Sequence, residues 1–248
     1  MLQPHIQCEK ASKMVLLPGD PDRVNRVAQF LEDPKLVANN REFRTMTGMY
    51  KGMEVTVTST GISGVSAVIA LEELIECGGE YFIRIGSAGA VQSHIKLGDL
   101  ILPMGAVRED GASAMYVEHR YPAVADFEIL SALKEKAEEL GYTHHIGVTR
   151  SHDSFYIDEE QEKMAYWNKK NVLGSDMETA SLFVVGKLRD VKVGSVLNNV
   201  VLYSNDLKEG VNDYVNEPKQ AQLGEEREIH LALEALLAIH KKSVENRI

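Results

Sequence analysis

The stretch MVLLPGDPDRV, from Met14 to Val24, predicts a change from a buried strand to a helix. Its apolar run stops at Pro18-Gly19, which is typical of a strand end. Asp20 is suited to cap a helix that starts at Pro21, because proline lacks the N–H that a first helical turn leaves unpaired. Glycine lets a ligand approach the backbone, a helix N-terminus presents free N–H groups, and Arg23 adds positive charge. The stretch therefore predicts a strand–turn–helix joint and is a candidate anion site.

The composition is that of an ordinary globular protein. Its 248 residues are 44% hydrophobic and 26% charged, and this length suits one α/β domain over residues 1–248. Thirty-seven acidic against 27 basic residues give a net charge of −10, which argues against a nucleic-acid partner or an anionic membrane surface. The chain has no apolar run near the ~20 residues of a membrane helix and no signal-peptide core, so we expect a cytoplasmic protein. Cys8 and Cys77 predict neither a disulfide framework nor a zinc site.

Strand and helix patterns alternate along most of the chain. Runs rich in β-branched residues predict strands at Val15–Leu17, Val55–Ser59, Tyr81–Ile85, Leu100–Val107, Ile146–Thr149 and Val193–Leu202. Apolar spacing and composition predict helices at Arg23–Leu31, Ala67–Cys77, Phe127–Leu140, Glu159–Lys170, Glu178–Leu188 and Glu225–Lys242. Strands separated by such helices predict an α/β fold with a mainly parallel, mixed sheet and helices on both faces. Tyr203–Leu223 is predicted to be a loop.

Three predicted strands end in glycine-rich turns, where α/β sheets bind ligands. These turns contain Gly19, Gly61 and Gly86. The third strand also carries Arg84 among apolar residues, and a buried arginine needs an anionic partner or several acceptors. A buried ion pair is the alternative explanation for Arg84. Because the net charge repels anions, an anion site depends on locally placed arginines, and these features together favour such a site.

Seven motifs carry a resemblance to a known family: PGDPDR at 18–23, NREF at 40–43, STGISG at 59–64, RIGSAGA at 84–90, YPAVADFE at 121–128, DSFY at 153–156 and SDMETA at 175–180. In this order they resemble nucleoside phosphorylases of the uridine phosphorylase and hexameric purine nucleoside phosphorylase type. The resemblance extends to about residue 190. It implies a central twisted mixed β-sheet flanked by helices, dimers assembled into a hexamer, and a role in nucleoside salvage. The implied reaction is reversible phosphorolysis of a nucleoside to free base and (deoxy)ribose 1-phosphate.

The resemblance also implies a phosphate site and a ribose site. The implied phosphate ligands are Gly19, Arg23, Arg84, Ser87 and, from a neighbouring subunit, Arg41. The glycine lets the backbone approach the ligand closely, the arginines supply planar, positively charged donors, and the serine supplies a hydroxyl. These groups together suit a phosphate dianion. The implied ribose ligands are Met177, Glu178 and, from the neighbouring subunit, His5. Inorganic phosphate is then a co-substrate, no cofactor is required, and Arg84 and Glu178 are the candidate catalytic residues.

Each ribose residue has a simpler explanation in isolation. Met177 suits core packing, Glu178 suits a helix start where the dipole favours a carboxylate, and His5 suits a solvated N-terminal segment. Asp176 stands where the family usually has glutamate, and this shortening weakens any role for it in the site.

The residues that bind the base do not all match one branch of the family. Phe155 is expected to stack on the base in either branch, and Val200 and Val201 stand where the purine branch has an acid, which favours the uridine branch. Asp206, a few residues further on, is the remaining candidate acid. Gln161 and Lys163 resemble the Gln-x-Arg pair that reads uracil, with lysine in place of arginine; a solvated helix face explains them equally. Uridine phosphorylase is the leading prediction, and purine nucleoside phosphorylase is the alternative.

Two further expectations concern ions and function class. Glu42, Ile62 and Ser66 match positions that hold potassium in some uridine enzymes, although a surface glutamate and two turn residues would look the same. A nucleosidase, which needs no phosphate, and a noncatalytic anion-binding module remain alternatives to a phosphorylase.

Overall fold

The structure is a computed structural model that describes residues 2–203 and 218–245. Its strands are β1 (Met14–Pro18), β2 (Glu32–Asn40), β3 (Phe43–Tyr50), β4 (Met53–Thr58), β5 (Tyr81–Ala90), β6 (Leu100–Glu109), β7 (Ala123–Val124), β8 (His144–His152), β9 (Gly174–Asp176) and β10 (Lys192–Val201). Its helices are α1 (Pro21–Ala28), α2 (Ser63–Glu76), α3 (Gly111–Tyr116), α4 (Phe127–Glu139), α5 (Glu160–Asn168), α6 (Thr179–Leu188) and α8 (Pro218–Glu245). None of these helices combines the length and apolar character that crossing a membrane requires.

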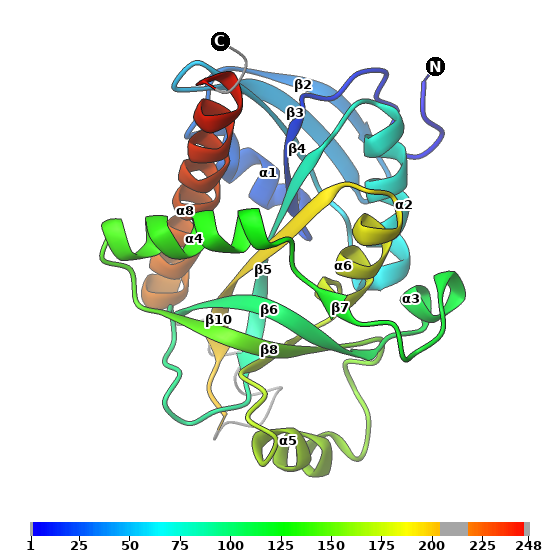
Figure 1. The fold of residues 1–248 in the computed structure, drawn as a ribbon, viewed down its shortest axis with the longest axis vertical. Coiled ribbons are helices and arrows are strands. Elements are labelled where there is room, and N and C mark those ends of the chain that lie inside the picture. Colours follow the sequence, from blue (N-terminus) through cyan, green and yellow to red (C-terminus); the bar gives the residue numbers. More distant parts are fainter. Residues whose placement is uncertain (1, 204–217, 246–248) are drawn as a thin grey trace.

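The described strands form one mixed sheet, which confirms the predicted α/β fold. The order of the ten strands is β10-β6-β8-β9-β5-β1-β4-β3-β2, with β7 beside β6. β1 runs parallel to both β4 and β5, and β10 is parallel to β5 but antiparallel to β6. Because β10 pairs with β5 as well as β6, five strands close into a circuit of β5, β10, β6, β8 and β9 (Figure 1). The carboxyl ends of β1, β4, β5 and β10 therefore meet on one side of the sheet.

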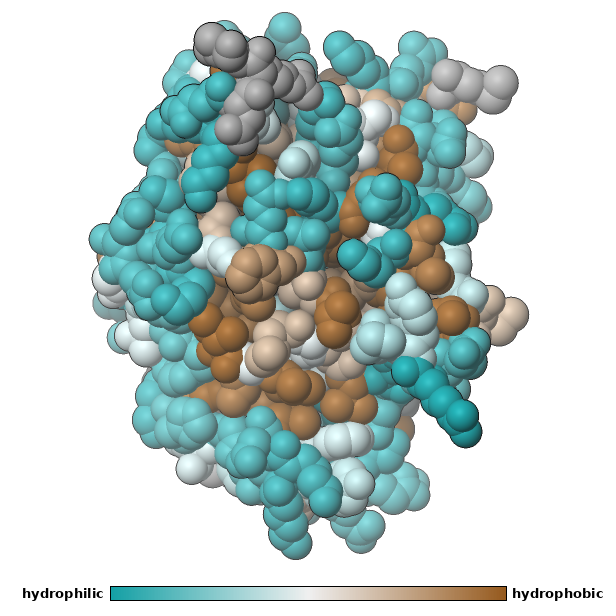
Figure 2. Space-filling model, in the orientation of Figure 1, coloured by the Kyte–Doolittle hydropathy of each residue, from teal (hydrophilic) through white to brown (hydrophobic). Residues whose placement is uncertain are grey.

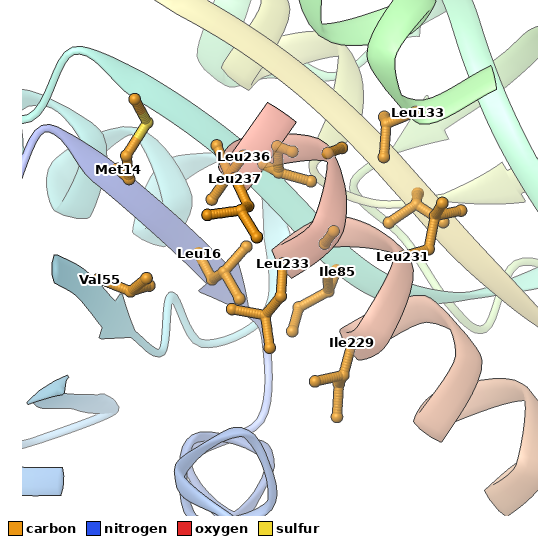
Figure 3. Packing of buried hydrophobic residues seen from close by; sticks show 14 of the residues in the cluster. Met14, Leu16, Val55, Ile85, Leu133, Ile229, Leu231, Leu233, Leu236 and Leu237 are labelled. Carbon is orange, nitrogen blue, oxygen red and sulfur yellow. The ribbon is translucent and has the colours of Figure 1, made fainter. Parts of the chain in front are cut away.

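The apolar run in β1 is continuous because both of its faces are buried. Met14 and Leu16 pack with the helices α1, α4 and α8, whereas Val15 and Leu17 pack with α2 and α6 on the other face. Figure 3 shows the first of these layers, in which Leu233 and Leu237 of α8 lie against β1 and β5. α8 and α2 accordingly lie on opposite sides of the sheet in Figure 1. This packing fixes the point where β1 stops, at Pro18.

The joint after β1 has the predicted form. The carboxylate of Asp20 accepts a hydrogen bond from the backbone N–H of Asp22 at 2.9 Å, and α1 begins at Pro21. The turns after β1 and β4 are tied together, because the N–H of Gly61 donates to the carbonyl of Gly19 at 3.0 Å. Two strand ends are thus held side by side.

The sequence interpretation omitted β2 and β3, which form a hairpin at one edge of the sheet. Among the described strands β2 pairs with β3 alone. It contains Pro34 and is exposed along most of its length, so it lacks the alternation of apolar and polar residues that reveals a half-buried strand. The C-terminal helix was also predicted too short, since α8 begins at Pro218 rather than at Glu225.

Candidate active site

A cavity of about 740 Å³ lies where the carboxyl ends of the central strands meet. Gly19 follows β1, Gly61 follows β4, Ser87 belongs to β5, and Val200 belongs to β10, and all four line the cavity. A segment after β8 and helix α5 supply further lining residues, including Phe155. The volume is within the range of small-molecule binding sites.

Arg23 reaches the cavity from the first turn of α1. Its side chain is only 6% exposed. Nη1 donates to the carbonyl of Ile85 and Nη2 to the hydroxyl of Ser87, each at 3.2 Å, so the guanidinium lies across the end of β5. Nε donates to Glu225 at 2.8 Å, which anchors the arginine to α8. Arg23 and Ser87 are therefore neighbours although 64 residues separate them.

Arg84 is the second arginine of the cavity wall, and its side chain is 4% exposed. Nε donates to Asp176 Oδ2 at 2.9 Å, and Nη2 lies 2.6 Å from Glu178 Oε2. Burial works against the charge on Arg84, but the carboxylates of Glu178 and Asp176 outweigh it and hold its pKa above the ordinary arginine value. The predicted ion pair is present, and the charged group also faces the cavity.

Gly86 makes room for this arginine. A Cβ placed on Gly86 would lie 2.5 Å from Nη2 of Arg84 and 2.6 Å from its Cζ. Residues two apart on a strand share a face, so the guanidinium folds back over the glycine. Any larger residue at this position would force Arg84 to move.

Glu178 is fixed between strand β9 and helix α6. The N–H of Ser63 donates to Oε1 at 2.7 Å, and the N–H of Met177 donates to Oε2 at 3.2 Å. Ser63 has a φ of 76°, a left-handed conformation that is uncommon for a residue with a side chain. Burial raises the pKa of Glu178, and the neighbouring Arg84 offsets this only in part. Met177 lines the cavity beside it.

Asp176 lines the cavity and binds Arg84 directly, although its side chain is shorter than the glutamate that the family usually has there. Besides Arg84, its carboxylate accepts hydrogen bonds from the hydroxyls of Ser151 at 2.6 Å and Thr179 at 2.5 Å. The N–H of Thr179 adds a third donor at 3.0 Å, at the start of α6. The shorter aspartate therefore binds Arg84 and the start of α6 at once.

The α5 side of the cavity, defined here as Phe155, Glu160 and Met164, contains polar groups that the sequence interpretation missed. Glu160 Oε1 accepts from Nη1 of the buried Arg150 at 3.0 Å, and Arg150 is also bonded to Glu109 at 2.6 Å. His152 lines the same side and its Nδ1 lies 2.8 Å from the carbonyl of Ser154. Burial and the nearby Arg150 lower the pKa of His152, so its imidazole is neutral at pH 7.

The structure brings most of the predicted site residues to this one cavity. Those that line it are Gly19, Arg23, Arg84, Ser87, Met177, Glu178, Phe155, Val200 and Val201. Glu42, Ile62 and Ser66 also line it, and the hydroxyl of Ser66 donates to Glu42 Oε1 at 3.0 Å. Their suggested roles in binding phosphate, ribose, base or potassium stay predictions.

Four predicted residues are not among the described residues that line the cavity, and a fifth lies outside the described residues. Two of the four, Arg41 and His5, were predicted to act in the site of a neighbouring subunit. Gln161 and Lys163 lie on the exposed side of α5, and the described lining residues of that helix are Glu160 and Met164. Arg41 is exposed in the turn between β2 and β3. His5 is held at α2, where its Nδ1 lies 2.5 Å from Glu73 Oε1 and its N–H donates to the same carboxylate. Asp206 lies outside the described residues.

The missed residues could be found in part from spacing. Glu160 and Met164 are four apart and so share a helix face, but Gln161 and Lys163 flank that face at a spacing of three residues, so spacing alone does not separate the two pairs. Gly86 lies two residues beyond Arg84 on the same strand face. His152 gave no local signal, because its position at the end of β8 depends on the sheet.

The fold and the cavity define an α/β protein in which two buried arginines line a cavity at the carboxyl ends of the strands, an arrangement that suits an anionic ligand. A family model described as the phosphorylase superfamily matches residues 13–237. The chain belongs to this superfamily and, within it, to the nucleoside phosphorylases, which are pentosyltransferases with phosphate as co-substrate.

Individual relatives agree with this assignment. A uridine phosphorylase from Thermococcus kodakarensis is 42% identical over 79% of this chain and 76% of that protein. A guanosine phosphorylase from Halorubrum lacusprofundi is 35% identical over 96% of this chain and 99% of that protein. The crystal structure of a uridine phosphorylase from Vibrio fischeri has a TM-score of 0.90 and 48% identity, and the match covers 95% of this chain and 97% of that one.

Proposed function

We propose that this nucleoside phosphorylase acts on uridine and related nucleosides, and that phosphate is held between Arg23 and Arg84. The observation that carries the phosphate site is the pair of buried arginines that line one cavity together with the Ser87 hydroxyl. Two planar guanidinium groups and a hydroxyl suit a phosphate dianion, and at Gly19 a ligand can approach the backbone closely.

Phosphate bound there attacks the anomeric carbon of the ribose as the bond to the base breaks. Its negative charge also stabilises the oxocarbenium-like transition state, so positioning and electrostatics supply most of the rate. We propose that Glu178 accepts hydrogen bonds from the ribose hydroxyls while Met177 packs on the sugar. The backbone N–H groups and Arg84 that hold the Glu178 carboxylate support this role. No covalent nucleophile takes part.

The base would stack on Phe155 against Val200 and Val201. The apolar wall and the uridine phosphorylase relatives support uridine as the first candidate. Guanosine is the second candidate, because Glu160 on the α5 side supplies a carboxylate that matches the two adjacent N–H donors of guanine. The full-length match to a guanosine phosphorylase supports the same candidate.

We further propose that a second copy of the chain completes the site with Arg41 and His5, within a hexamer built from dimers. Both residues are accessible, and two exposed apolar side chains lie where the cavity meets the start of α2: Ile62, which lines the cavity, and Val65 in the first turn of α2. A second exposed apolar group lies on the outer side of β6, β7 and β8 and includes Met104, Val124, Ile146 and Val148. Figure 2 shows apolar side chains gathered across the middle of one face with polar side chains around them. Such patches mark protein interfaces.

Three smaller parts of the proposal follow. The protein works in the cytoplasm in nucleoside salvage. No cofactor is needed. A potassium ion binds near Glu42, Ile62 and Ser66, where a carboxylate and a hydroxyl lie together.

The decisive experiment measures base release from uridine, thymidine, inosine, guanosine and adenosine, with and without inorganic phosphate. Release that requires phosphate, with formation of ribose 1-phosphate, is the expected result, and uridine is expected to be fastest. Phosphate-independent release would identify a nucleosidase instead. Phosphate binding without any turnover would identify a noncatalytic module.

The shared site is tested by mixing two inactive variants, Arg41→Ala and Arg84→Ala. If each site takes Arg41 from a partner, one of the two sites in every mixed dimer is intact. Random mixing then restores about a quarter of the wild-type activity. Mixtures that stay inactive, although mass spectrometry shows mixed dimers, would contradict the shared site.

A further inference from the structure

Two carboxylates of the C-terminal helix lie behind the proposed phosphate site. Arg23 Nε donates to Glu225 Oε2 at 2.8 Å, and its Nη1 lies 3.2 Å from Glu228 Oε1. The Glu228 side chain has no exposed surface. Arg23 and Ser87 are among the described lining residues of the cavity, whereas Glu225 and Glu228 are not. The helix therefore holds Arg23 from the protein side, and the opposite guanidinium nitrogen, Nη2, donates to Ser87 at the cavity.

The charges around this arginine do not balance. Three arginines take part in the described network: Arg23, Arg84 and the partly exposed Arg26, which pairs with Glu225 and Asp20. Four buried carboxylates face them: Asp176, Glu178, Glu225 and Glu228. If all four are ionised, negative charge is in excess before a phosphate dianion enters. Unbalanced charge is costly in a buried site, so a proton is expected to be taken up.

Glu228 is suited to carry that proton. Its Oε1 makes no well-directed hydrogen bond within the described part of the chain, and the side-chain oxygen of its neighbour Asn198 is also buried without a partner there. Its Oε2 accepts from the Asn198 N–H at 3.1 Å. The groups that face it are Arg23 from α1, Arg84 and Asn198 from the sheet, and Glu225 on its own helix. Burial raises the pKa of Glu228 to about 8, with Glu225 adding to the rise and the two arginines opposing it.

We propose that Glu228 is a positioning residue that, at alkaline pH, takes up a proton when phosphate binds beside Arg23. The proposal rests on the phosphate site of the proposed function. An anion near Arg23 disfavours a second negative charge on the far side of the same guanidinium, so bound phosphate favours the neutral acid. By linkage, a neutral Glu228 favours bound phosphate to the same degree.

The pH range of the effect follows from these signs. Below about pH 8, Glu228 of the free enzyme is already neutral, and phosphate binds without taking up a proton. Above that pH, Glu228 of the free enzyme is ionised, so each phosphate must bring a proton with it. Phosphate affinity then falls by up to about tenfold per pH unit. Inorganic phosphate is a dianion throughout this alkaline range and does not itself contribute.

The test is calorimetric titration of inorganic phosphate into the nucleoside-free protein at about pH 9, in buffers of different ionisation enthalpy. The wild-type protein is expected to take up close to one proton per phosphate, and Glu228→Gln close to none. Glu226→Gln is the matched control, because Glu226 is an exposed glutamate of the same helix, and it should behave as wild type. Equal proton uptake by Glu228→Gln and wild type would assign the proton to another group, such as Glu178, and overturn the proposal.

The wild-type measurement decides the question even if Glu228→Gln does not fold. Phosphate binding with no proton uptake and no loss of affinity between about pH 8 and 10 would overturn the role of Glu228 alone. If phosphate does not bind and the rate of base release does not depend on phosphate, the proposed function is overturned as well. The two failures are therefore distinguishable.

Discussion

The two sides of the cavity are built differently. The arginine side, which consists of Arg23, Arg84 and Ser87, is part of the central sheet and the helix that follows β1, and both arginine side chains are at least nine-tenths buried. The α5 side, with Phe155, Glu160 and Met164, comes from the segment after β8 and from a helix with no buried residue. The groups proposed to bind phosphate thus sit on the central sheet and α1, whereas Glu160, the polar group proposed to read the base, sits on a peripheral helix.

The difference has an energetic side. On the arginine side both guanidinium groups are paired with buried carboxylates, so removal of an arginine leaves buried carboxylates uncompensated, at a cost of about 3–5 kcal/mol. Exposed residues of α5 have no such partners to lose, and surface changes usually alter stability by less than about 0.5 kcal/mol. Substitutions on the two sides should therefore differ in their effects on both activity and folding.

The largest effect is expected for Arg84→Ala. It removes a proposed phosphate ligand and leaves Asp176 and Glu178 buried without their cation. We expect kcat/KM for phosphorolysis to fall by about 10²- to 10³-fold, together with a lower melting temperature. Arg189→Ala is the matched control, since Arg189 forms an exposed pair with Glu72. Wild-type phosphate affinity in Arg84→Ala would contradict the proposed site.

A smaller effect on the same side is expected for Gly86→Ala. The added methyl group would lie 2.5 Å from Arg84 Nη2, so the guanidinium must move while its charge remains. We expect kcat/KM to fall by about ten- to a hundredfold, because a displacement of about 1 Å is enough to misplace a reacting group. Kinetics measured at varied phosphate concentration would show it. Gly141→Ala adds the same methyl group where no atom lies within 4 Å, although its positive φ lowers stability, and should leave the rate unchanged.

The same division explains how far the sequence could predict the site. The ends of β1 and β4 are predictable because apolar runs, glycines and the Asp20 cap are local signals, and because the ends of parallel strands converge. The turn predicted at Gly86 was wrong, since β5 continues through this glycine to Ala90. Arg84 stood out as a charge within an apolar strand. Its partners were not predictable from spacing, because Asp176 is 92 residues away and approaches only when β9 pairs with β5.

The α5 side was harder to predict for a physical reason. Gln161 and Lys163 resemble a base-reading pair, yet the face of a short polar helix that turns inward is decided by tertiary contacts. In this structure Glu160 is on the inward face of α5 and forms an ion pair with Arg150. Arg150 lies in β8, and its burial is a property of the closed strand circuit that no local pattern reports.

On the α5 side, Glu160→Gln is expected to change base preference more than rate. The carboxylate matches the adjacent N–H groups of guanine, whereas an amide also offers the donor that a uracil carbonyl requires. The ratio of kcat/KM for uridine to that for guanosine should rise about tenfold. Glu162→Gln, on the exposed side of the same helix, is the control and should leave the ratio unchanged. An unchanged ratio in Glu160→Gln would remove Glu160 from base recognition.

The smallest effects are expected for Gln161→Ala and Lys163→Ala. Both side chains are exposed on α5 and neither is among the described residues that line the cavity. If α5 keeps this orientation when a nucleoside binds, KM for uridine should change by less than about threefold in either variant, because no buried contact is lost. Steady-state kinetics with uridine and guanosine would measure this. An increase of tenfold or more for uridine alone would mean that α5 rotates to bring the Gln-x-Lys pair to the base. The contrast between a fixed arginine side and a movable α5 side would then be sharper than the present geometry shows.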